Sequence, residues 1–161
     1  MKRIMIIGCS GSGKSTFSRE LQKKTCLPLF HLDMLFWNKD KTHVSREVFD
    51  EHLNEILKRE SWIIDGNYSR TLEMRLKACD TVFLLDFPVD TCLDGANARI
   101  GKQRDDIPWV EQELDEEFKR WITEFPQKEL PRIYSLLKKY NDKDIFIFKS
   151  HDDVDRFLEE I

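Results

Sequence analysis

The sequence lacks a long hydrophobic run, since no apolar stretch approaches the roughly 20 residues of a membrane-spanning helix. It also lacks an excess of positive charge, because 26 lysines and arginines face 30 aspartates and glutamates, giving a net charge of −4. Dedicated nucleic-acid-binding domains are normally basic. We therefore expect no membrane association. DNA is a possible partner, but the negative net charge gives no support for it.

Cysteine is sparse, and its four copies at positions 9, 26, 79 and 92 form no Cys-x-x-Cys pair. No histidine lies at metal-ligand spacing from them, so neither a zinc site nor a redox motif is indicated. Scattered reduced thiols are typical of cytosolic proteins. The apolar run at the N-terminus is too short for a signal peptide, and we expect a cytoplasmic location.

Glycine and proline are also few, at six and five residues, and no low-complexity or linker segment divides the chain. A length of 161 residues is typical of one compact domain with a single core. We therefore expect residues 1–161 to form one domain, present as a monomer or a homodimer.

The sequence does contain one specific motif, Gly-Cys-Ser-Gly-Ser-Gly-Lys-Ser over residues 8–15. It fits the P-loop pattern G-x-x-x-x-G-K-[ST], with an apolar strand-like run before it and helical spacing after it. Glycines let backbone N–H groups approach an anion, and the following helix adds about half a positive charge. The residues expected to bind the nucleotide are Gly8, Ser10, Gly11, Ser12, Gly13, Lys14, Ser15 and Thr16.

Two residues of this loop have more specific expected roles. Lys14 is expected to reach the β- and γ-phosphates of a nucleoside triphosphate and to act in catalysis. The hydroxyl of Ser15 is a hard oxygen ligand suited to Mg²⁺. The motif therefore predicts a site for ATP and Mg²⁺.

Strands and helices alternate along the chain, which predicts an α/β protein with a parallel sheet covered by helices on both faces. Apolar runs predict strands, and capping residues before spaced apolar positions predict helices. The expected strands cover residues 3–7, 27–32, 62–64, 81–85 and 145–148. The expected helices cover 15–24, 45–57, 69–78, 90–102, 108–124, a segment after Pro126 ending near 140, and the residues after Ser150.

Three expected strands are followed by aspartates, namely Asp33, Asp65 and Asp86. Ligands of open parallel sheets bind beyond the carboxyl ends of the strands, where the P-loop also lies. We assign Asp65 to Mg²⁺, the alternative being a cap for the turn that follows it. Asp33 is assigned to orienting the acceptor as a catalytic and substrate-binding residue, the alternative being a helix or loop cap. Asp86 is expected to hold its own loop.

Positive charge over the transferred phosphoryl group is expected from Arg99 and Arg104. They flank a short connection from which a lid could close and exclude water, the alternative being a solvated helix face. Asn67, Arg70 and Arg75 follow the third expected strand and are predicted to bind the acceptor. For Arg75, pairing with a nearby acid is the alternative.

His31 and the tryptophans receive no assigned role. A histidine within a strand is more often a packed, hydrogen-bonded core residue than a catalyst. The four tryptophans, at positions 37, 62, 109 and 121, are interpreted mostly as core or lid packing. One of them could stack on a base or a substrate ring, but their spacing does not say which.

The P-loop, Asp33 and the strand end at Asp65-Gly66 resemble the small nucleoside-monophosphate and shikimate kinases. That resemblance implies a P-loop NTPase fold of three α/β/α layers, with strand order 2-3-1-4-5 and a short lid. The chain also resembles the DNA topology modulation (FlaR-type) family of adenylate-kinase-like proteins. The segments that carry this second resemblance are His31-Leu32-Asp33, Trp62-Ile63-Ile64-Asp65-Gly66-Asn67-Tyr68, Arg75-Leu76, Phe83-Leu84-Leu85-Asp86-Phe87-Pro88, Glu117-Phe118-Lys119-Arg120-Trp121 and Phe125-Pro126.

The motif and the resemblance together predict a Mg²⁺- and ATP-dependent phosphotransferase acting on a small nucleotide or another hydroxyl compound. The alternative is an ATP-binding regulatory protein that affects DNA topology with little or no turnover. A third hypothesis is a plain ATPase, for which water is the acceptor.

Overall fold

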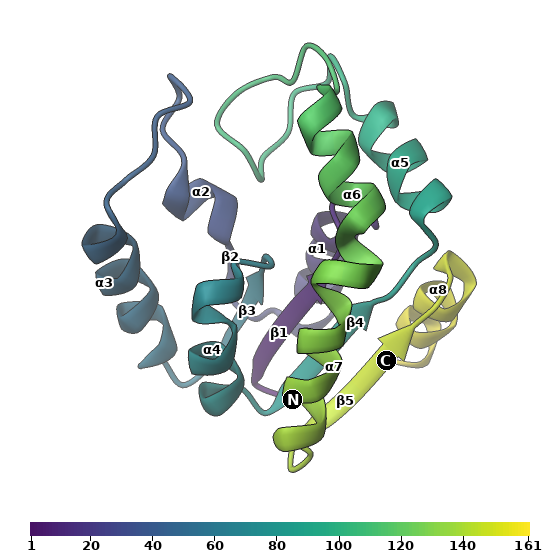
Figure 1. Cartoon of the computed structure of the whole chain (residues 1–161). Helices are drawn as coiled ribbons and strands as arrows, with labels where there is room; N and C mark the ends of the chain where they lie inside the picture. The colour runs from purple at the N-terminus through teal and green to yellow at the C-terminus, as the bar shows by residue number, and fades with distance from the viewer.

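A five-stranded parallel sheet forms the centre of the computed structural model, which describes all 161 residues (Figure 1). The strand order is β2-β3-β1-β4-β5, which confirms the order and the parallel sheet that the sequence analysis expected. Every residue of β3 and β4 is buried, in keeping with the apolar runs that make up most of both strands. The strands are β1 (Arg3–Gly8), β2 (Leu29–His31), β3 (Trp62–Asp65), β4 (Thr81–Leu85) and β5 (Asp144–Phe148).

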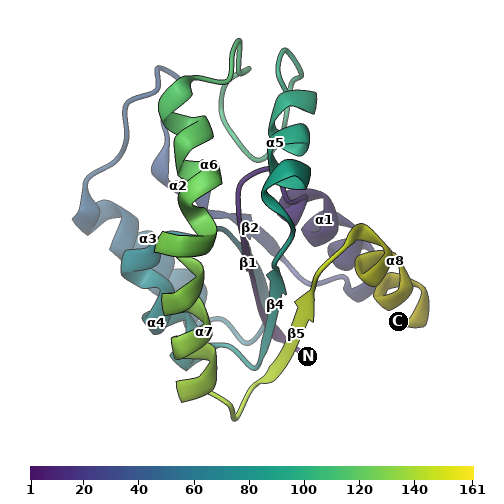
Figure 2. The ribbon, with the colours of Figure 1, turned by 45° about the vertical axis from the view of Figure 1, so that its right-hand side comes forward.

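Helices cover both faces of this sheet and complete a three-layer α/β/α arrangement. Figure 2 shows α6 and α7 on one side of the strands and α1 and α8 on the other. No helix is both long and apolar enough to cross a lipid bilayer. The helices are α1 (Lys14–Thr25), α2 (Leu32–Phe36), α3 (Arg46–Leu57), α4 (Leu72–Ala78), α5 (Val89–Ala98), α6 (Glu116–Lys128), α7 (Leu130–Lys139) and α8 (His151–Glu160), with a single 3₁₀ turn, η1 (Ser69–Thr71).

Side-chain caps fix where several helices begin. The hydroxyl of Ser45 accepts a hydrogen bond from the backbone N–H of Val48 at the start of α3. Ser150 and Asp153 form a reciprocal capping box at the start of α8, as their spacing predicts. The expected helices at these two places are therefore confirmed.

The expected helix over 108–124 is wrong in its first half. Residues 99–115, which we call the lid segment, contain no helix or strand, and α6 begins only at Glu116. The carboxylate of Asp115 accepts a hydrogen bond from the backbone N–H of Phe118 and so caps the helix there. The helix then continues through Pro126, which lies in its last turn, and ends at Lys128.

Two boundaries near the site also differ from expectation. The second strand ends at His31, and Asp33 lies within the short helix α2 instead of at a strand end. The helix expected over 90–102 ends at Ala98, so the lid segment starts earlier than the sequence indicated.

The P-loop touches helix α5 through backbone atoms. A Cβ atom added to Gly11 would lie 1.9 Å from the carbonyl oxygen of Cys92, and one added to Gly95 would lie 2.0 Å from the carbonyl oxygen of Gly11. Only glycines allow this approach. The contact holds α5, and the start of the lid segment behind it, beside the phosphate loop.

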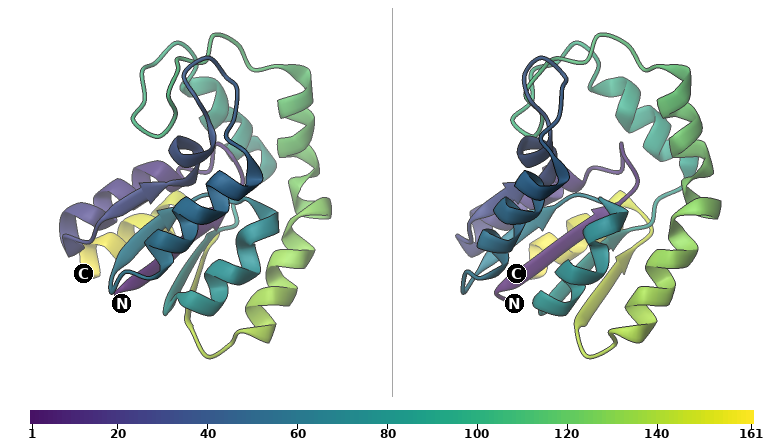
Figure 3. Two further views of the ribbon diagram at one scale, coloured as in Figure 1. Left: turned by 90° about the vertical axis from the view of Figure 1, so that its left-hand side faces the viewer. Right: turned by 60° about the vertical axis from the view of Figure 1, so that its left-hand side comes forward.

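Two long connections meet above the carboxyl ends of the strands. Both views of Figure 3 show the connection between α2 and α3 beside the lid segment. The rings of Trp37 and Trp109 join them edge to face, with centroids 5.4 Å apart. The fold thus encloses a space between these connections and the P-loop.

Candidate functional site

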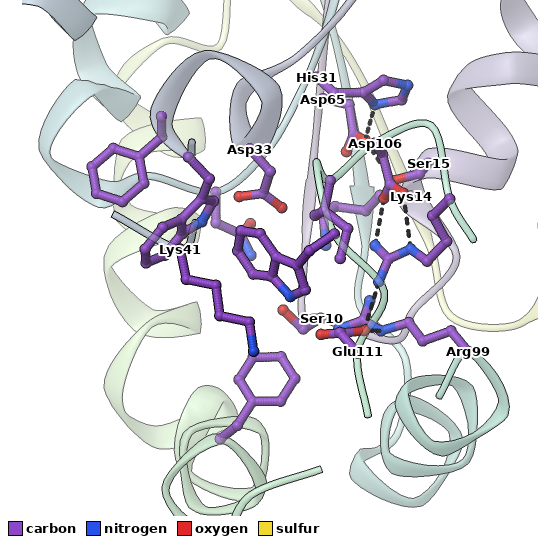
Figure 4. A pocket seen from close by; sticks show the side chains of 18 of the residues that line it. Ser10, Lys14, Ser15, His31, Asp33, Lys41, Asp65, Arg99, Asp106 and Glu111 are labelled. Atoms are coloured by element: carbon purple, nitrogen blue, oxygen red, sulfur yellow. Dashed lines mark hydrogen bonds and ion pairs between the residues drawn. The ribbon is translucent and has the colours of Figure 1, made fainter. Parts of the chain in front are cut away.

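A cavity of about 740 Å³ lies at the carboxyl ends of the strands. Its walls come from the P-loop, from the segments after β2 and β3, and from the lid segment (Figure 4). Eight of the site residues expected from the sequence line it: Ser10, Lys14, Ser15, Asp33, Asp65, Asn67, Arg99 and Arg104.

The P-loop has the backbone that phosphate binding requires. Gly11 and Gly13 have φ angles of +80° and +91°, a region in which residues with a Cβ are strained. Ser12 is buried, and its hydroxyl donates to the carbonyl oxygen of Cys9 over 2.7 Å. The ammonium of Lys14 donates to the same oxygen over 2.8 Å, which folds this side chain over the loop.

The other residues expected to bind the nucleotide do not line the cavity, so their role stays a prediction. Gly8 ends β1, and Gly13 directly precedes the first residue of α1. Thr16 is exposed on the first turn of α1, so its expected nucleotide contact stays a prediction.

Three oxygen atoms gather where Mg²⁺ is expected. The Ser15 hydroxyl lies 2.8 Å from Asp65 Oδ2 and 2.7 Å from Asp106 Oδ2. One hydroxyl carries a single hydrogen, so it can donate to only one of these carboxylates at a time.

The donor set at Asp65 fits a magnesium ion. Its carboxylate is only 5% exposed, and its buried Oδ1 atom has no hydrogen-bond partner. A buried carboxylate oxygen without a partner is costly unless a ligand or cation completes it. No group of three or more histidine, cysteine or acidic side chains could hold a metal here, so Ser15 and Asp65 would need nucleotide or water oxygens to complete the coordination.

His31 is a site neighbour that the sequence analysis did not include. Its Nδ1 lies 2.8 Å from Asp65 Oδ2, so the expected hydrogen bond of this histidine is confirmed. The ring also lines the cavity, which the sequence analysis did not expect. Burial lowers the pKa of His31, but the hydrogen bond to Asp65 and the charges of Asp65 and Asp106 outweigh that effect and raise it overall. The partner is 34 positions away in the sequence, so no local pattern could reveal it.

Asp33 faces the same space as Lys14 (Figure 4). Its Oδ1 accepts a hydrogen bond of 2.6 Å from the hydroxyl of Tyr68. Burial raises the pKa of the Asp33 carboxyl above its ordinary value, although the bond from Tyr68 acts in the opposite direction. The carboxylate is therefore a stronger proton acceptor than an exposed aspartate.

The lid arginines are held by two acids that the sequence analysis did not identify as site residues. Arg104 donates to both carboxylate oxygens of Asp106, over 2.8 and 2.6 Å, and to Glu111 Oε2 over 2.8 Å. Arg99 Nε lies 3.1 Å from the same Glu111 oxygen. Burial opposes ionisation of Asp106, but Arg104 and Ser15 outweigh it and lower its pKa to about 2. These charge pairs hold the lid segment together, and the hydrogen bond between Ser15 and Asp106 attaches it to the P-loop.

Asn67 lines the cavity, but its amide group is engaged with the P-loop strand. Its Oδ1 accepts from the backbone N–H of Gly8 over 2.9 Å, and its Nδ2 donates to the Gly8 carbonyl. Both bonds join the ends of β1 and β3. The side chain of Asn67 therefore positions the loop, which differs from the expected role in binding the acceptor.

Arg70 and Arg75 do not lie where acceptor binding would place them. Arg70 pairs with Asp50 through two hydrogen bonds of 2.6 and 2.9 Å and lies outside the cavity. Arg75 is 0% exposed and donates to the carbonyl groups of Gly66, Asn67 and Tyr68. Its guanidinium holds the turn after β3. The expected contact of Arg75 with an anionic acceptor is therefore wrong.

Comparison with solved structures identifies the fold as that of the small P-loop kinases. Shikimate kinase from Bacteroides thetaiotaomicron superposes with a TM-score of 0.60 and 19% identity, over 99% of this chain and 97% of that one. Shikimate kinase from Acinetobacter baumannii, solved with shikimate, gives 0.61 and 16%, over 99% and 90%. Deoxyadenosine kinase from M. mycoides, solved with dCMP and dCDP, gives 0.58 and 18%, over 98% and 95%.

Comparisons of sequence alone do not assign the chain to a family. No protein-family model matches the chain, and no curated protein matches it. The identities to the solved kinases are 16–19%, so the likeness concerns the fold. The resemblance to the DNA topology modulation family stays a prediction.

Proposed function

We propose that this protein transfers the γ-phosphoryl group of ATP to a hydroxyl group of a small acceptor. The observation that carries the proposal is that Lys14, Ser15, Asp65 and Asp33 line one cavity with the lid arginines across it. Phosphoryl transfer needs a phosphate cradle, a metal-holding acid, a group that orients the attacking oxygen and added positive charge. The cavity contains a candidate for each.

The P-loop residues would bind and orient the donor. The backbone N–H groups of the loop and the N-terminus of α1 favour a polyphosphate chain. Lys14, whose ammonium donates to the carbonyl oxygen of Cys9 in this structure, would turn to the phosphates and offset their charge. Ser15 and Asp65 would hold Mg²⁺, which when bound offsets the negative charge of the phosphates.

Asp33 would act on the acceptor. Its carboxylate would accept the proton of the attacking hydroxyl while a new oxygen–phosphorus bond forms and the bond to the ADP oxygen breaks. Arg99 and Arg104, on the lid segment, would offset charge on the transferred group. The lid segment, packed over the cavity, would exclude water and so favour transfer over hydrolysis.

The test is incubation with Mg²⁺, ATP and a panel of nucleotides, nucleosides and small alcohols, with ³¹P NMR to detect a new phosphate ester. We expect an ester from the unmodified protein and none above background from Lys14→Ala. Lys39→Ala is the matched control, because Lys39 is exposed and does not line the cavity. An ester formed equally well by Lys14→Ala would contradict the mechanism, and ATP binding without any ester would favour the regulatory alternative.

A further inference from the structure

We propose that the acceptor is an uncharged alcohol that carries a planar ring, an inference that rests on the proposed function. The cavity combines a wall of aromatic side chains near Asp33 with a shortage of unpaired positive charge. The first feature favours a flat ring, and the second disfavours an acceptor bearing a phosphate or carboxylate group.

Six of the seven hydrophobic residues that line the cavity are aromatic: Phe36, Trp37, Tyr68, Trp109, Phe118 and Trp121. Trp37 packs against Phe36 with ring centroids 4.8 Å apart and against Trp109 at 5.4 Å, edge to face in both cases. Phe36 also lies 5.3 Å from Tyr68. Aromatic side chains bind flat rings by stacking, which contributes roughly 1–3 kcal/mol per base in nucleic-acid-binding proteins.

Phe36, Trp37 and Tyr68, which we call the aromatic wall, lie on the side of Asp33 where the acceptor is expected. Phe36 follows Asp33 by three residues in α2, and Tyr68 is hydrogen-bonded to Asp33. An acceptor hydroxyl must lie between Asp33 and the phosphates at Lys14. The remainder of the acceptor molecule then extends toward Phe36, Trp37 and Tyr68.

Charge at the cavity disfavours an anion. Its lining has four lysines and arginines, Lys14, Lys41, Arg99 and Arg104, against six acids, Asp33, Asp65, Asp106, Glu111, Glu113 and Asp115. Two of these cations, Arg99 and Arg104, already contact Glu111 or Asp106 and are assigned to the transferred phosphoryl group. A third, Lys14, belongs to the donor phosphates. An anionic acceptor would therefore find only Lys41, whose ammonium lies 6.0 Å from the Trp109 ring centroid.

The arginines that could have completed an anion site are used elsewhere. Arg70 forms its pair with Asp50 outside the cavity, and Arg75 is buried among backbone carbonyls. Binding a phosphate or carboxylate beside Asp33 without a partner would cost desolvation and repulsion energy. A neutral ring alcohol avoids both.

The first experiment compares matched acceptors at fixed Mg²⁺ and ATP. The probes are cytidine, cytidine 5′-monophosphate and shikimate, which offer a flat ring alone, the same ring with a phosphate, and an acid without an aromatic ring. We expect kcat/KM for cytidine at least tenfold above the other two. A preference for the monophosphate or for shikimate would overturn this inference while leaving the proposed function intact.

A binding measurement tests this inference independently of catalysis. Calorimetry of the same probes on protein saturated with Mg²⁺ and a non-hydrolysable ATP analogue requires no turnover. Tighter binding of cytidine than of its monophosphate supports the inference even if no ester forms. Equal or weaker binding of cytidine overturns it. Absence of any ester from the whole panel would instead count against the proposed function.

Trp37 provides the residue-level test. We expect Trp37→Leu to raise the KM for the ring acceptor about tenfold, with the KM for ATP within about twofold, as loss of one stacking contact implies. Trp37→Phe should restore most of the acceptor KM, and thermal melts confirm that both variants fold. If Trp37→Leu raises the KM for ATP instead, the aromatic wall holds the base of ATP and the inference is wrong.

Discussion

The Tyr68 hydroxyl donates a 2.6 Å hydrogen bond to Asp33 Oδ1, joining the segment after β3 to helix α2. The two residues are 35 positions apart in the sequence. Burial raises the pKa of Asp33, and the bond from Tyr68 stabilises the ionised carboxylate and limits that rise. The pair therefore sets how strongly Asp33 accepts a proton.

Asp33→Asn tests this residue directly. An amide cannot accept the acceptor's proton, so we expect kcat to fall by about 10²- to 10⁴-fold with the KM for ATP unchanged. Steady-state kinetics with the acceptor found in the panel give both constants. Asp142→Asn is the matched control because its side chain is 69% exposed. A full rate in Asp33→Asn would remove the proposed role of Asp33.

Tyr68→Phe should move the pH dependence of the reaction. Activity requires ionised Asp33, so kcat falls as the pH drops through the pKa of Asp33, which lies above the ordinary value of 3.8. Loss of the phenol removes a donor that favours the carboxylate, and the acidic limb should shift to higher pH. A pH–rate profile of both proteins measures the shift. An unmoved limb, or one at lower pH, would contradict the assignment.

Ser15→Ala should weaken the use of magnesium. The variant loses the hydroxyl that lies 2.8 Å from Asp65 Oδ2, and we expect at least a tenfold rise in the Mg²⁺ concentration that gives half-maximal rate. A titration of rate against Mg²⁺ at saturating ATP measures it, with chelator as the zero point. Ser15→Thr keeps a hydroxyl and should remain near the unmodified protein. Equal Mg²⁺ requirements for the alanine and threonine variants would argue against a metal at Ser15.

Arg75→Met should destabilise the fold more than Arg70→Met. Removing the fully buried Arg75 guanidinium leaves backbone carbonyls without donors, and we expect a loss of about 2–4 kcal/mol in the free energy of unfolding. The Arg70 pair with Asp50 is partly exposed to solvent, so its loss should cost at most about 1 kcal/mol. Urea unfolding of the two variants gives the comparison. Similar losses would show that Arg75 does not support the turn after β3.

The sequence was sufficient for the sheet and for placing Asp65 beside the P-loop. Strand runs and the P-loop are local patterns, and the chain topology carried Asp65 to the loop as expected. Asp33 also lines the cavity, although it does so from a helix that the sequence analysis did not expect.

The rest of the site depends on long-range partners that no local pattern encodes. The lid segment has no apolar periodicity of its own, and it reaches the P-loop through the hydrogen bond between Ser15 and Asp106, which are 91 positions apart. The sequence could not show that Arg70 would find Asp50 or that His31 would find Asp65, because each pair forms only when separate elements pack. The expected helix over 108–124 is wrong because Asp115 caps α6 at a later residue.

The close backbone contact between Gly11 and Gly95 limits how the P-loop and α5 can move relative to each other. With no side chain between them, the phosphate loop and the middle of α5 are in direct backbone contact. We expect any movement of the lid segment to leave this contact intact and to occur farther along the chain, where Gly101 has a φ angle of +73° and no atom within 4 Å of its Cβ position.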